Sequence, residues 1–461
     1  MKRRAAWLLV LGDSSNGTLR IMYCSVERVF NPALEGRPLV VLSSNDGACI
    51  ARSNEAKELG VQMAQPWFQV RHMQKTHGLV ALSANFELYS DMSARMMAIA
   101  SRYSPNVVPY SIDEAFIDFD GIPGDLTGIS RELRATVLQE LGLPVSVGLA
   151  PTKTLAKLAN HIAKTCDRKP DFYPAELSRR LAQVCNVAEL AKADLQALME
   201  RTDVGDVWGV GRKIATQLHA GGVHSVLDLT RSDVASLRRQ FSVVFEKTVL
   251  ELRGTPCMGV DDAPAAKQQI LVSRSFGRAV TEVDGIVEAV SEFVSRAAEK
   301  LRQQGSVAGA IQVFLTTSPF RVQDRQHSPS TVVPLRPTSD TRHLVRAATS
   351  AAAEIFRSGF NYTKAGVMLV DLQSAAEVRQ QPELDMFAEP APADEASTRD
   401  RGTLMSTMDS LNRRFGRGSV RIGSATTAVA NDAGTASWSV RQERRTPRYT
   451  TRWKEMPLVR C

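Results

Sequence analysis

The sequence contains little cysteine and few aromatic residues. Six of its 461 residues are cysteines, and 6% are Phe, Trp or Tyr. The cysteines are scattered, and no two of them form a Cys-x-x-Cys pair. A disulfide framework or a structural zinc site is therefore not expected, and the composition fits a protein of the reducing cytoplasm.

No stretch of the chain approaches the ~20 consecutive apolar residues that span a membrane. The N-terminus carries Lys2, Arg3 and Arg4 before an apolar run, and in this respect it resembles a short signal peptide. The run is short, and no clear cleavage site of small residues follows it. We therefore expect residues 6–11 to form a buried β-strand, and we expect no membrane association.

Acidic residues are outnumbered by basic ones. The chain has 49 Asp and Glu against 57 Lys and Arg, which gives a formal net charge of +8. This excess suits a polyanionic partner such as nucleic acid, although an anionic membrane surface would attract it as well. The length predicts about two to four domains with ample core.

Two adjacent carboxylates, Asp113 and Glu114, lie between apolar residues of high strand propensity. Adjacent side chains of a regular strand point to opposite faces. The two carboxylates can therefore share one metal ion only if the chain turns there or the ion lies at the strand's edge. Taken alone, such a pair is more often a solvated surface feature.

The surrounding sequence motifs change that interpretation. Residues 110–118 read YSIDEAFID and resemble the carboxylate motif of Y-family (lesion-bypass) DNA polymerases. Further motifs resemble those of this family and occur in the family's order along the chain. Within the family the resemblance is to the UmuC-like branch, and it runs from about Tyr23 to the C-terminus. They are VVLSSNDGA at 40–48, ARSNEAK at 51–57, VGLAPTKTLAK at 147–157 and DVWGVG at 206–211.

The resemblance implies an α/β multidomain fold, the right-hand polymerase with palm, fingers, helix-hairpin-helix thumb and an α+β little finger. The implied boundaries are palm at 1–30 and 80–186, fingers at 31–79, thumb at 187–262, little finger at 267–373, a flexible linker at 374–402 and a UmuC-type C-terminal segment at 403–461.

Local patterns predict the secondary structure of each part. We expect strands at 39–42, 144–148, 270–276, 310–316 and 365–372, and a strand pair at 107–119. We expect helices at 53–59, 88–103, 129–141, 153–164, 286–301, 344–356 and 404–415, a mostly helical stretch at 187–260, and an irregular loop at 167–183.

The implied reaction is attack of a primer 3′-hydroxyl on the α-phosphorus of a deoxynucleoside triphosphate, assisted by two Mg²⁺ ions. Mg²⁺ prefers oxygen ligands, and Asp113 and Glu114 match two of the three carboxylates that the family supplies. The family's remaining Asp stands five residues before Tyr23, where this chain has Thr18.

Three explanations remain open for that position. Asp13 serves as the third metal ligand through a bulged strand. Alternatively, the chain is a natural variant with weakened catalysis, or residues 1–21 are a misread start or a frameshifted segment of an ordinary polymerase.

The resemblance also assigns residues around the nucleotide. Tyr23 matches the steric gate, a ring that excludes a ribose 2′-hydroxyl. Lys57 and Lys164 match basic residues that contact the triphosphate. Asn54 stands where many relatives have tyrosine, and Arg52 is the nearby basic alternative.

Other residues match the parts that hold primer-template DNA. Gly209 and Gly211 allow the backbone to approach a phosphate, and Arg212 and Lys213 add positive charge at the start of the next helix. Arg274 and Arg278 are candidates for phosphate contact in the little finger. Each of these arginines is equally compatible with an ordinary solvated position.

Residues 374–402 are rich in Ala, Pro, Glu and Asp, which is typical of a flexible linker. Exposed apolar residues in such a linker indicate a binding peptide. The word at 381–387 resembles the clamp-binding motif of bacterial polymerases, with anchors at Gln381, Leu384, Met386 and Phe387. The basic, aromatic-dotted tail beyond it would bind nucleic acid or pack as a small appended domain.

The leading hypothesis is an error-prone translesion DNA polymerase of the SOS response. Its implied partners are a processed UmuD dimer, the RecA filament and the sliding clamp. The second hypothesis is a catalytically impaired, polymerase-like DNA-binding adaptor. A plain helix-hairpin-helix DNA-binding protein would leave the carboxylate motif unexplained.

Overall fold

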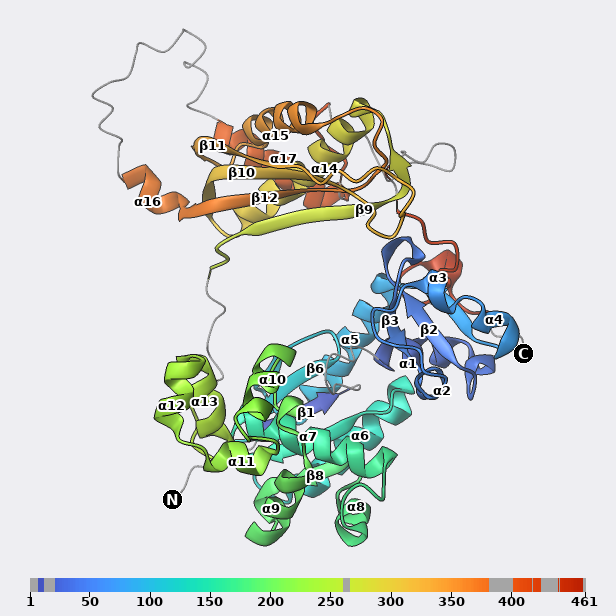
Figure 1. Cartoon of the computed structure of the whole chain (residues 1–461), viewed down its shortest axis with the longest axis vertical. Helices are drawn as coiled ribbons and strands as arrows, with labels where there is room; N and C mark the ends of the chain where they lie inside the picture. The colour runs from blue at the N-terminus through green and yellow to red at the C-terminus, as the bar shows by residue number, and fades with distance from the viewer. Residues whose placement is uncertain are drawn as a thin grey trace. The chain divides into compact units, whose positions relative to one another are not determined.

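A computed structural model describes residues 7–11, 21–259, 266–380, 401–416, 418–423, 438 and 440–458. The chain forms two compact units (Figure 1). Unit 1 comprises Met1–Ala263 together with Gln442–Cys461, and unit 2 comprises Pro264–Arg441. Each unit is described separately below.

A five-stranded sheet forms the centre of unit 1, in the order β5-β6-β1-β7-β8. Strand β1 is central and antiparallel to both neighbours, which confirms the strand expected near the N-terminus. Strands β5 and β6 form the expected pair. The strands are β1 (Trp7–Leu11), β5 (Val107–Pro109), β6 (Glu114–Asp118), β7 (Ser146–Ala150) and β8 (Val184–Asn186).

Helices α5, α6 and α7 pack with this sheet, whereas α1 packs against α5 and the second sheet of unit 1. Helix α7 lies very close to β7. A Cβ added at Gly148 of β7 would lie 2.3 Å from the carbonyl oxygen of Ala156 and 2.3 Å from the amide nitrogen of Asn160. The absence of a side chain at Gly148 therefore permits α7 to lie directly against β7. The helices are α1 (Ile21–Phe30), α5 (Phe86–Ala100), α6 (Leu126–Leu141) and α7 (Lys153–Arg168).

A three-stranded sheet, ordered β3-β2-β4, forms a second layer of unit 1. All four residues of β2 are buried, as expected for its continuous apolar run. Ser53 caps the predicted helix α2 by accepting from the amide of Ala56. The elements are β2 (Leu39–Leu42), β3 (Cys49–Arg52), β4 (Val80–Ser83), α2 (Asn54–Glu58), α3 (Trp67–Val70) and α4 (Met73–Thr76).

The expected irregular loop at 167–183 is wrong. Helix α7 continues to Arg168, and a further helix, α8 (Ala175–Leu181), follows Pro174. Leu177 and Leu181 lie one turn apart on α8, and both are buried. Proline and other helix-breaking residues therefore indicated a break in regular secondary structure, but the apolar spacing after Pro174 still favours a helix.

Residues 187–260 are mostly helical, as expected. The helices are α9 (Lys192–Arg201), α10 (Arg212–Ala220), α11 (Val226–Arg231), α12 (Val234–Gln240) and α13 (Val243–Leu252). Buried Glu251 joins α13 to the start of α7, because one of its carboxylate oxygens accepts from the amide (2.9 Å) and the hydroxyl (2.7 Å) of Thr154.

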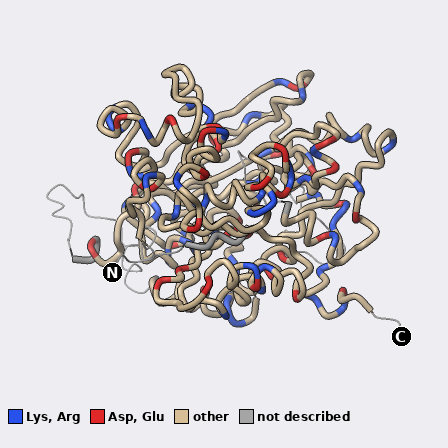
Figure 2. Tube along the Cα trace, turned by 90° about the horizontal axis from the view of Figure 1, so that it is seen from below, with Lys and Arg blue, Asp and Glu red and all other residues tan. Residues whose placement is uncertain are grey.

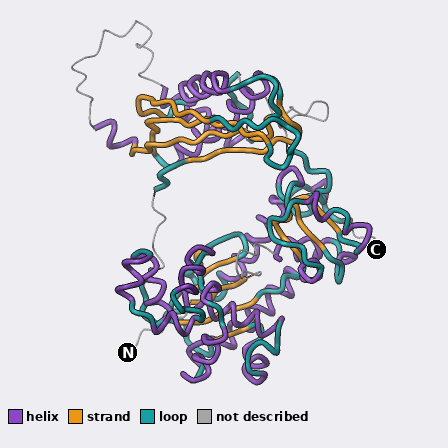
Figure 3. The backbone as a smooth tube through the Cα atoms, in the orientation of Figure 1, coloured by secondary structure: helices purple, strands orange, loops and turns teal. Residues whose placement is uncertain are grey.

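Unit 2 contains a four-stranded antiparallel sheet in the order β11-β10-β12-β9, packed against α14 and α15 (Figure 3). Three strands and both helices were expected. The elements are β9 (Ile270–Val280), β10 (Ser306–Thr317), β11 (Ser330–Thr338), β12 (Tyr362–Ser374), α14 (Val283–Gln303) and α15 (Thr341–Ile355).

The sequence patterns did not locate strand β11, which contains Pro334 and Pro337. Among the described strands, it lies at the edge of the sheet and pairs with β10 alone. An edge strand tolerates proline, since the amide facing away from the sheet has no ladder partner to lose.

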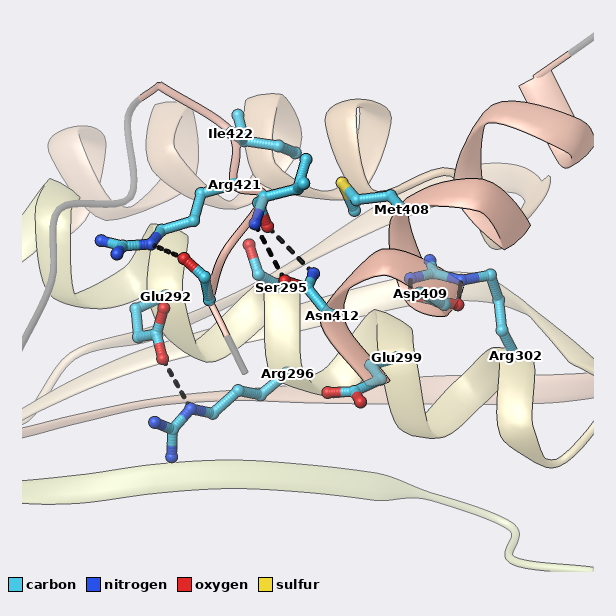
Figure 4. Close-up of a pocket in the computed structure, with 12 residues that line it drawn as sticks. Glu292, Ser295, Arg296, Glu299, Arg302, Met408, Asp409, Asn412, Arg421 and Ile422 are labelled. Atoms are coloured by element: carbon cyan, nitrogen blue, oxygen red, sulfur yellow. Dashed lines mark hydrogen bonds and ion pairs between the residues drawn. The ribbon is translucent and has the colours of Figure 1, made fainter. Parts of the chain in front are cut away.

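Two further helices follow the sheet, α16 (Ala375–Gln380) and α17 (Arg401–Phe415). Helix α17, which was expected, docks on α14 through a bidentate ion pair between Arg302 and Asp409, with both N–O distances at 2.7 Å (Figure 4). The interface borders a cavity of about 60 Å³. The clamp-binding word at 381–387 lies outside the described residues.

Within the described ranges, no helix combines the length and the apolar character needed to cross a membrane.

We predict that Gly148→Ala destabilises unit 1. The added methyl group would overlap the backbone of α7, and such overpacking costs about 1–3 kcal/mol or more of unfolding free energy. Urea unfolding of the variant measures this loss. Gly211→Ala is the matched control, because the Cβ added there meets no atom within 4 Å. Equal midpoints for the two variants would contradict the close β7–α7 contact.

Candidate active site

Asp113 and Glu114 lie where the chain leaves a turn and enters β6. The amides of Tyr110 and Ser111 both donate to the carbonyl oxygen of Glu114, at 2.8 and 3.0 Å. Asp113 therefore belongs to the turn, and Glu114 is the first residue of the strand. This is the turn that convergence of adjacent carboxylates requires. Both side chains are buried, with 4% of each residue exposed.

Neighbouring side chains hold the two carboxylates. The hydroxyl of Ser111 donates to Oδ1 of Asp113 at 2.5 Å. The ammonium of Lys157, on α7, forms an ion pair with Oε2 of Glu114. The carboxylates are thus fixed by one hydroxyl and one cation from different elements.

Lys157 is a site residue that the sequence reasoning did not identify. Its Nζ lies 4.4 Å from the ring centroid of Tyr110, inside a partly aromatic environment. Burial lowers the pKa of the Lys157 ammonium, against the opposing attraction of Glu114 and Asp113. The spacing carried a signal, because Lys157 stands two helical turns before the expected site residue Lys164 and so lies near the same helix face.

The third carboxylate of the expected set is not described. Strand β1 ends at Leu11, which lies opposite Glu114 in the antiparallel register. Asp13 and Thr18 follow in the sequence and lie outside the described residues. Among the residues that are described, no cluster of three or more His, Cys, Asp or Glu side chains would hold a metal ion.

Tyr23 is buried on α1 and stacks on Tyr89 of α5, with ring centroids 4.2 Å apart and an interplanar angle of 17°. The hydroxyl of Tyr89 donates to Oε1 of Glu27 at 2.6 Å. Desolvation raises the pKa of the buried Glu27 carboxyl above its usual value, despite opposing hydrogen bonds from Tyr89 and Thr446.

The expected nucleotide-binding residues occupy several environments. Arg52 is buried, and its guanidinium donates to the carbonyl oxygen of Val61. Lys57 is half-buried on α2, and Lys164 is buried on α7. Asn54 lines a cavity of about 210 Å³.

That cavity has a positive lining. Arg28, Arg134 and Arg168 contribute to it from α1, α6 and α7, together with the single carboxylate of Asp167. Arg28 is partly neutralised by an ion pair of 2.8 Å with Glu55. The cavity therefore offers basic groups on the side of α1 that faces α7.

Comparisons with known proteins agree with this geometry. Profiles of the impB/mucB/samB family match residues 19–161 and, for its C-terminal domain, residues 267–384. The family's HHH motif matches residues 192–223, and a domain of unknown function matches residues 402–459.

The chain is 41% identical to Protein UmuC of Salmonella typhimurium over 442 residues, which covers 95% of this chain and 98% of the relative. It is 39% identical to Protein MucB of Escherichia coli over 95% of this chain and 97% of that one. This chain belongs to the UmuC branch of the Y-family DNA polymerases.

The fold agrees with this membership. A solved Y-family DNA polymerase chimera of Dbh and Dpo4 matches 80% of this chain and 99% of its own length, with a TM-score of 0.60 and 19% identity. The fold is therefore the right-hand architecture of Y-family polymerases, with palm, fingers, thumb and little finger.

In the HHH motif of this Y-family chain, the expected glycines lie immediately before α10, and their contact with a DNA phosphate stays a prediction. Gly209 has a φ of +90°, a conformation that favours glycine. Gly211 is the N-cap of α10, and Arg212 and Lys213 are exposed in the first turn of that helix. Before the motif's turn, Nε1 of Trp208 donates to the hydroxyl of Tyr110 at 3.1 Å, which links this region to the carboxylate turn.

The two remaining residues that we expect to contact DNA, Arg274 and Arg278, lie on β9 in unit 2. Arg274 is half-buried, and Arg278 is exposed. Basic and acidic residues are interspersed along the trace (Figure 2). The distribution of charge along the chain therefore does not by itself identify these two arginines as DNA contacts.

We predict a pH-dependent stability difference between the wild type and Glu27→Gln. In the unfolded chain the Glu27 carboxyl titrates near its usual pKa of 4.5, and in the folded chain its pKa is higher. Between these two values the folded state binds more protons, so the unfolding free energy falls as pH rises through the window. Glutamine does not titrate.

Urea unfolding of both proteins from about pH 4 to about pH 8 tests this expectation. The stability of Glu27→Gln should rise relative to that of the wild type as pH increases above 4.5. A difference that stays constant over the whole range would contradict the raised pKa of Glu27.

Proposed function

We propose that this chain is the catalytic subunit of an error-prone translesion DNA polymerase of the SOS response, and that Asp113 and Glu114 are its catalytic carboxylates. One observation carries the proposal. The turn at 110–113 leads into β6 at Glu114, so two adjacent, buried carboxylates lie where that strand begins, in a chain 41% identical to Protein UmuC of Salmonella typhimurium. The palm, fingers, thumb and little finger would follow the boundaries expected from the sequence.

The described carboxylates fit Mg²⁺ in their chemistry. Mg²⁺ is commonly held by one or two carboxylates together with substrate phosphates. Asp113 and Glu114 offer oxygen donors of that kind, and both are fixed by neighbouring residues. When bound, two such ions would stabilise the charge on the attacking and leaving oxygens.

Protein residues would orient the reactants around this pair. Lys157 keeps the Glu114 carboxylate in place and offsets part of the negative charge of the pair. Lys57, Lys164, Arg52 and Asn54 are the proposed contacts of the incoming triphosphate, where cations stabilise developing phosphate charge. Tyr23 is the proposed gate against ribonucleotides.

The expected partners remain part of the proposal. Gln381, Leu384, Met386 and Phe387 would bind the sliding clamp, and a processed UmuD dimer and the RecA filament would complete the working polymerase. Gly209, Gly211, Arg212, Lys213, Arg274 and Arg278 would contact primer-template DNA. Chromosomal and plasmid DNA lie in the cytoplasm, so the proposed function implies a cytoplasmic location.

The adaptor hypothesis is less well supported. A chain that only bound DNA would have no use for Asp113 and Glu114 in this turn.

We predict that Asp113→Asn and Glu114→Gln each reduce nucleotide incorporation by at least roughly 10²-fold, because each removes a charged metal ligand. Primer extension on damaged and undamaged templates, with partner proteins supplied, measures the loss. Asp118→Asn, on the same strand, is the matched control and should retain activity. Unchanged incorporation by Asp113→Asn would refute the catalytic assignment. Asp13→Asn in the same assay separates the bulged-strand alternative from the other two.

We predict that Arg212→Ala and Lys213→Ala weaken DNA binding, and that they do so equally for different DNA sequences. Each lost phosphate contact should reduce the slope of log affinity against log salt by about 1. Fluorescence anisotropy with a primer-template duplex at several salt concentrations measures this slope. A parallel salt dependence for wild type and both variants would exclude these residues from the DNA interface.

A further inference from the structure

The last part of unit 1 has no assigned role. Residues 442–455, here called the C-terminal strap, fall within the region matched to a domain of unknown function. The strap packs in unit 1 against β4, the start of α5 and the helix α1.

The strap begins by extending the three-stranded sheet of the fingers. Arg445 forms a parallel bridge with Ser83, the last residue of β4. The Ser83 amide donates to the carbonyl oxygen of Arg444 at 3.0 Å, and the Arg444 amide donates to Oγ of Ser83 at 3.0 Å. Backbone pairing at the end of an edge strand gives the strap a defined register.

Asn85 binds the strap with its side chain. Its Nδ2 donates to the carbonyl oxygen of Thr446 (3.2 Å), to Oγ1 of Thr446 (3.1 Å) and to the carbonyl oxygen of Pro447 (3.0 Å). Asn85 is buried at the N-cap of α5 but makes no capping hydrogen bond. Asparagine is among the best N-cap residues, so its side chain serves the strap at the expense of the helix end.

Glu27 connects the strap to the proposed gate. Oε1 of Glu27 accepts from Oγ1 of Thr446 at 3.2 Å and from the Tyr89 hydroxyl at 2.6 Å. Tyr89 in turn stacks on Tyr23. Within the described residues, Oε2 of Glu27 is buried without a hydrogen-bond partner. The orientation of this carboxylate therefore depends on Thr446 and Tyr89.

The strap also contacts α1 and α5 beyond Thr446. Nε of Arg448 lies 2.8 Å from Oε2 of Glu87. The ring of Tyr449 stacks on Phe30, the last residue of α1, with centroids 4.7 Å apart and an interplanar angle of 3°. The strap therefore spans both helices that carry the Tyr23–Tyr89 ring pair.

A strained turn of the fingers is held at the other end of the strap. Asn45 and Asp46 both have positive φ, at 64° and 51°, which is costly for residues other than glycine. The Asp46 carboxylate accepts from Oγ of Ser83 at 2.6 Å and from the Glu443 amide at 3.3 Å.

We propose that the C-terminal strap is a positioning element for nucleotide selection, in which Thr446 and Asn85 act through Glu27 and Tyr89 on the gate ring of Tyr23. The inference rests on the proposed polymerase function and on the gate. In this proposal the strap acts indirectly, by fixing Glu27 and Tyr89 and through them the ring that does the selecting. Loss of the strap contacts releases Glu27 and Tyr89, and the Tyr23 ring then excludes a ribose less strictly.

The test compares incorporation of deoxynucleotides and ribonucleotides by the full chain. Thr446→Val keeps the side-chain shape but removes the hydroxyl, and we expect it to lower selectivity for deoxynucleotides by about three- to tenfold. Asn85→Asp should do the same, since aspartate caps α5 well but cannot donate to the strap. Thr446→Ser should restore selectivity to within about twofold of the wild type.

Thr451→Val, at an exposed position of the same strap, is the matched control and should leave selectivity unchanged. Equal selectivity in Thr446→Val and Thr451→Val would overturn the proposal. An equal loss of both incorporation rates in Thr446→Val, with the ratio unchanged, would also overturn it, because a merely structural role predicts that result.

Failure of this inference is distinguishable from failure of the proposed function. If Tyr23→Ala loses selectivity and Thr446→Val does not, the strap is excluded while the polymerase function stands. If the wild type makes no product, the polymerase function is excluded. In that case, amide hydrogen exchange at residues 83–89 tests whether the strap is docked. We expect Thr446→Val to exchange faster than the wild type there, and equal exchange rates would overturn the proposal.

Discussion

Adjacent side chains of a regular strand point to opposite faces, and the proposed active site depends on how this chain departs from that alternation at Asp113 and Glu114. The turn at 110–113 ends as β6 begins, so Asp113 is oriented by turn geometry and Glu114 by strand geometry. The turn is stabilised by two backbone hydrogen bonds to one carbonyl oxygen and by the Ser111 hydroxyl. The proposed chemistry requires this local departure from the sheet's alternation.

Helix α7 transmits this arrangement to the rest of unit 1. Its close approach to β7, which Gly148 permits, places Lys157 against Glu114 and brings Lys164 to the same helix face. Its first turn is bound to Glu251 of α13, so the helical region after residue 187 is linked to the same scaffold. Residues on one rigid helix keep fixed spacings, which favours a preorganised site.

Much of the fold was predictable because its signals are local. Continuous apolar runs predicted β1 and β2, and the carboxylate words predicted the strand pair around 107–119. Helix α8 was missed because Pro174 stands before its buried apolar pair. Strand β11 was missed because it contains two prolines, which only its edge position tolerates. Lys157 and Glu27 were missed for a different reason. Their partners lie 43 and 419 residues away in the chain, and no local pattern identifies those partners, although the spacing of Lys157 before Lys164 places both lysines near one helix face.

Unit 2 is inserted between two parts of unit 1 along the chain, since Pro264–Arg441 separates Met1–Ala263 from Gln442–Cys461. During synthesis from the N-terminus, helices α1 and α5, which carry the Tyr23–Tyr89 ring pair, therefore emerge long before the strap that contacts them. Every product that stops before residue 442 lacks those contacts and leaves Glu27 without Thr446. Strap docking would thus require synthesis beyond residue 442, and a product that stops earlier would lack the contacts that we propose to order the Tyr23 gate.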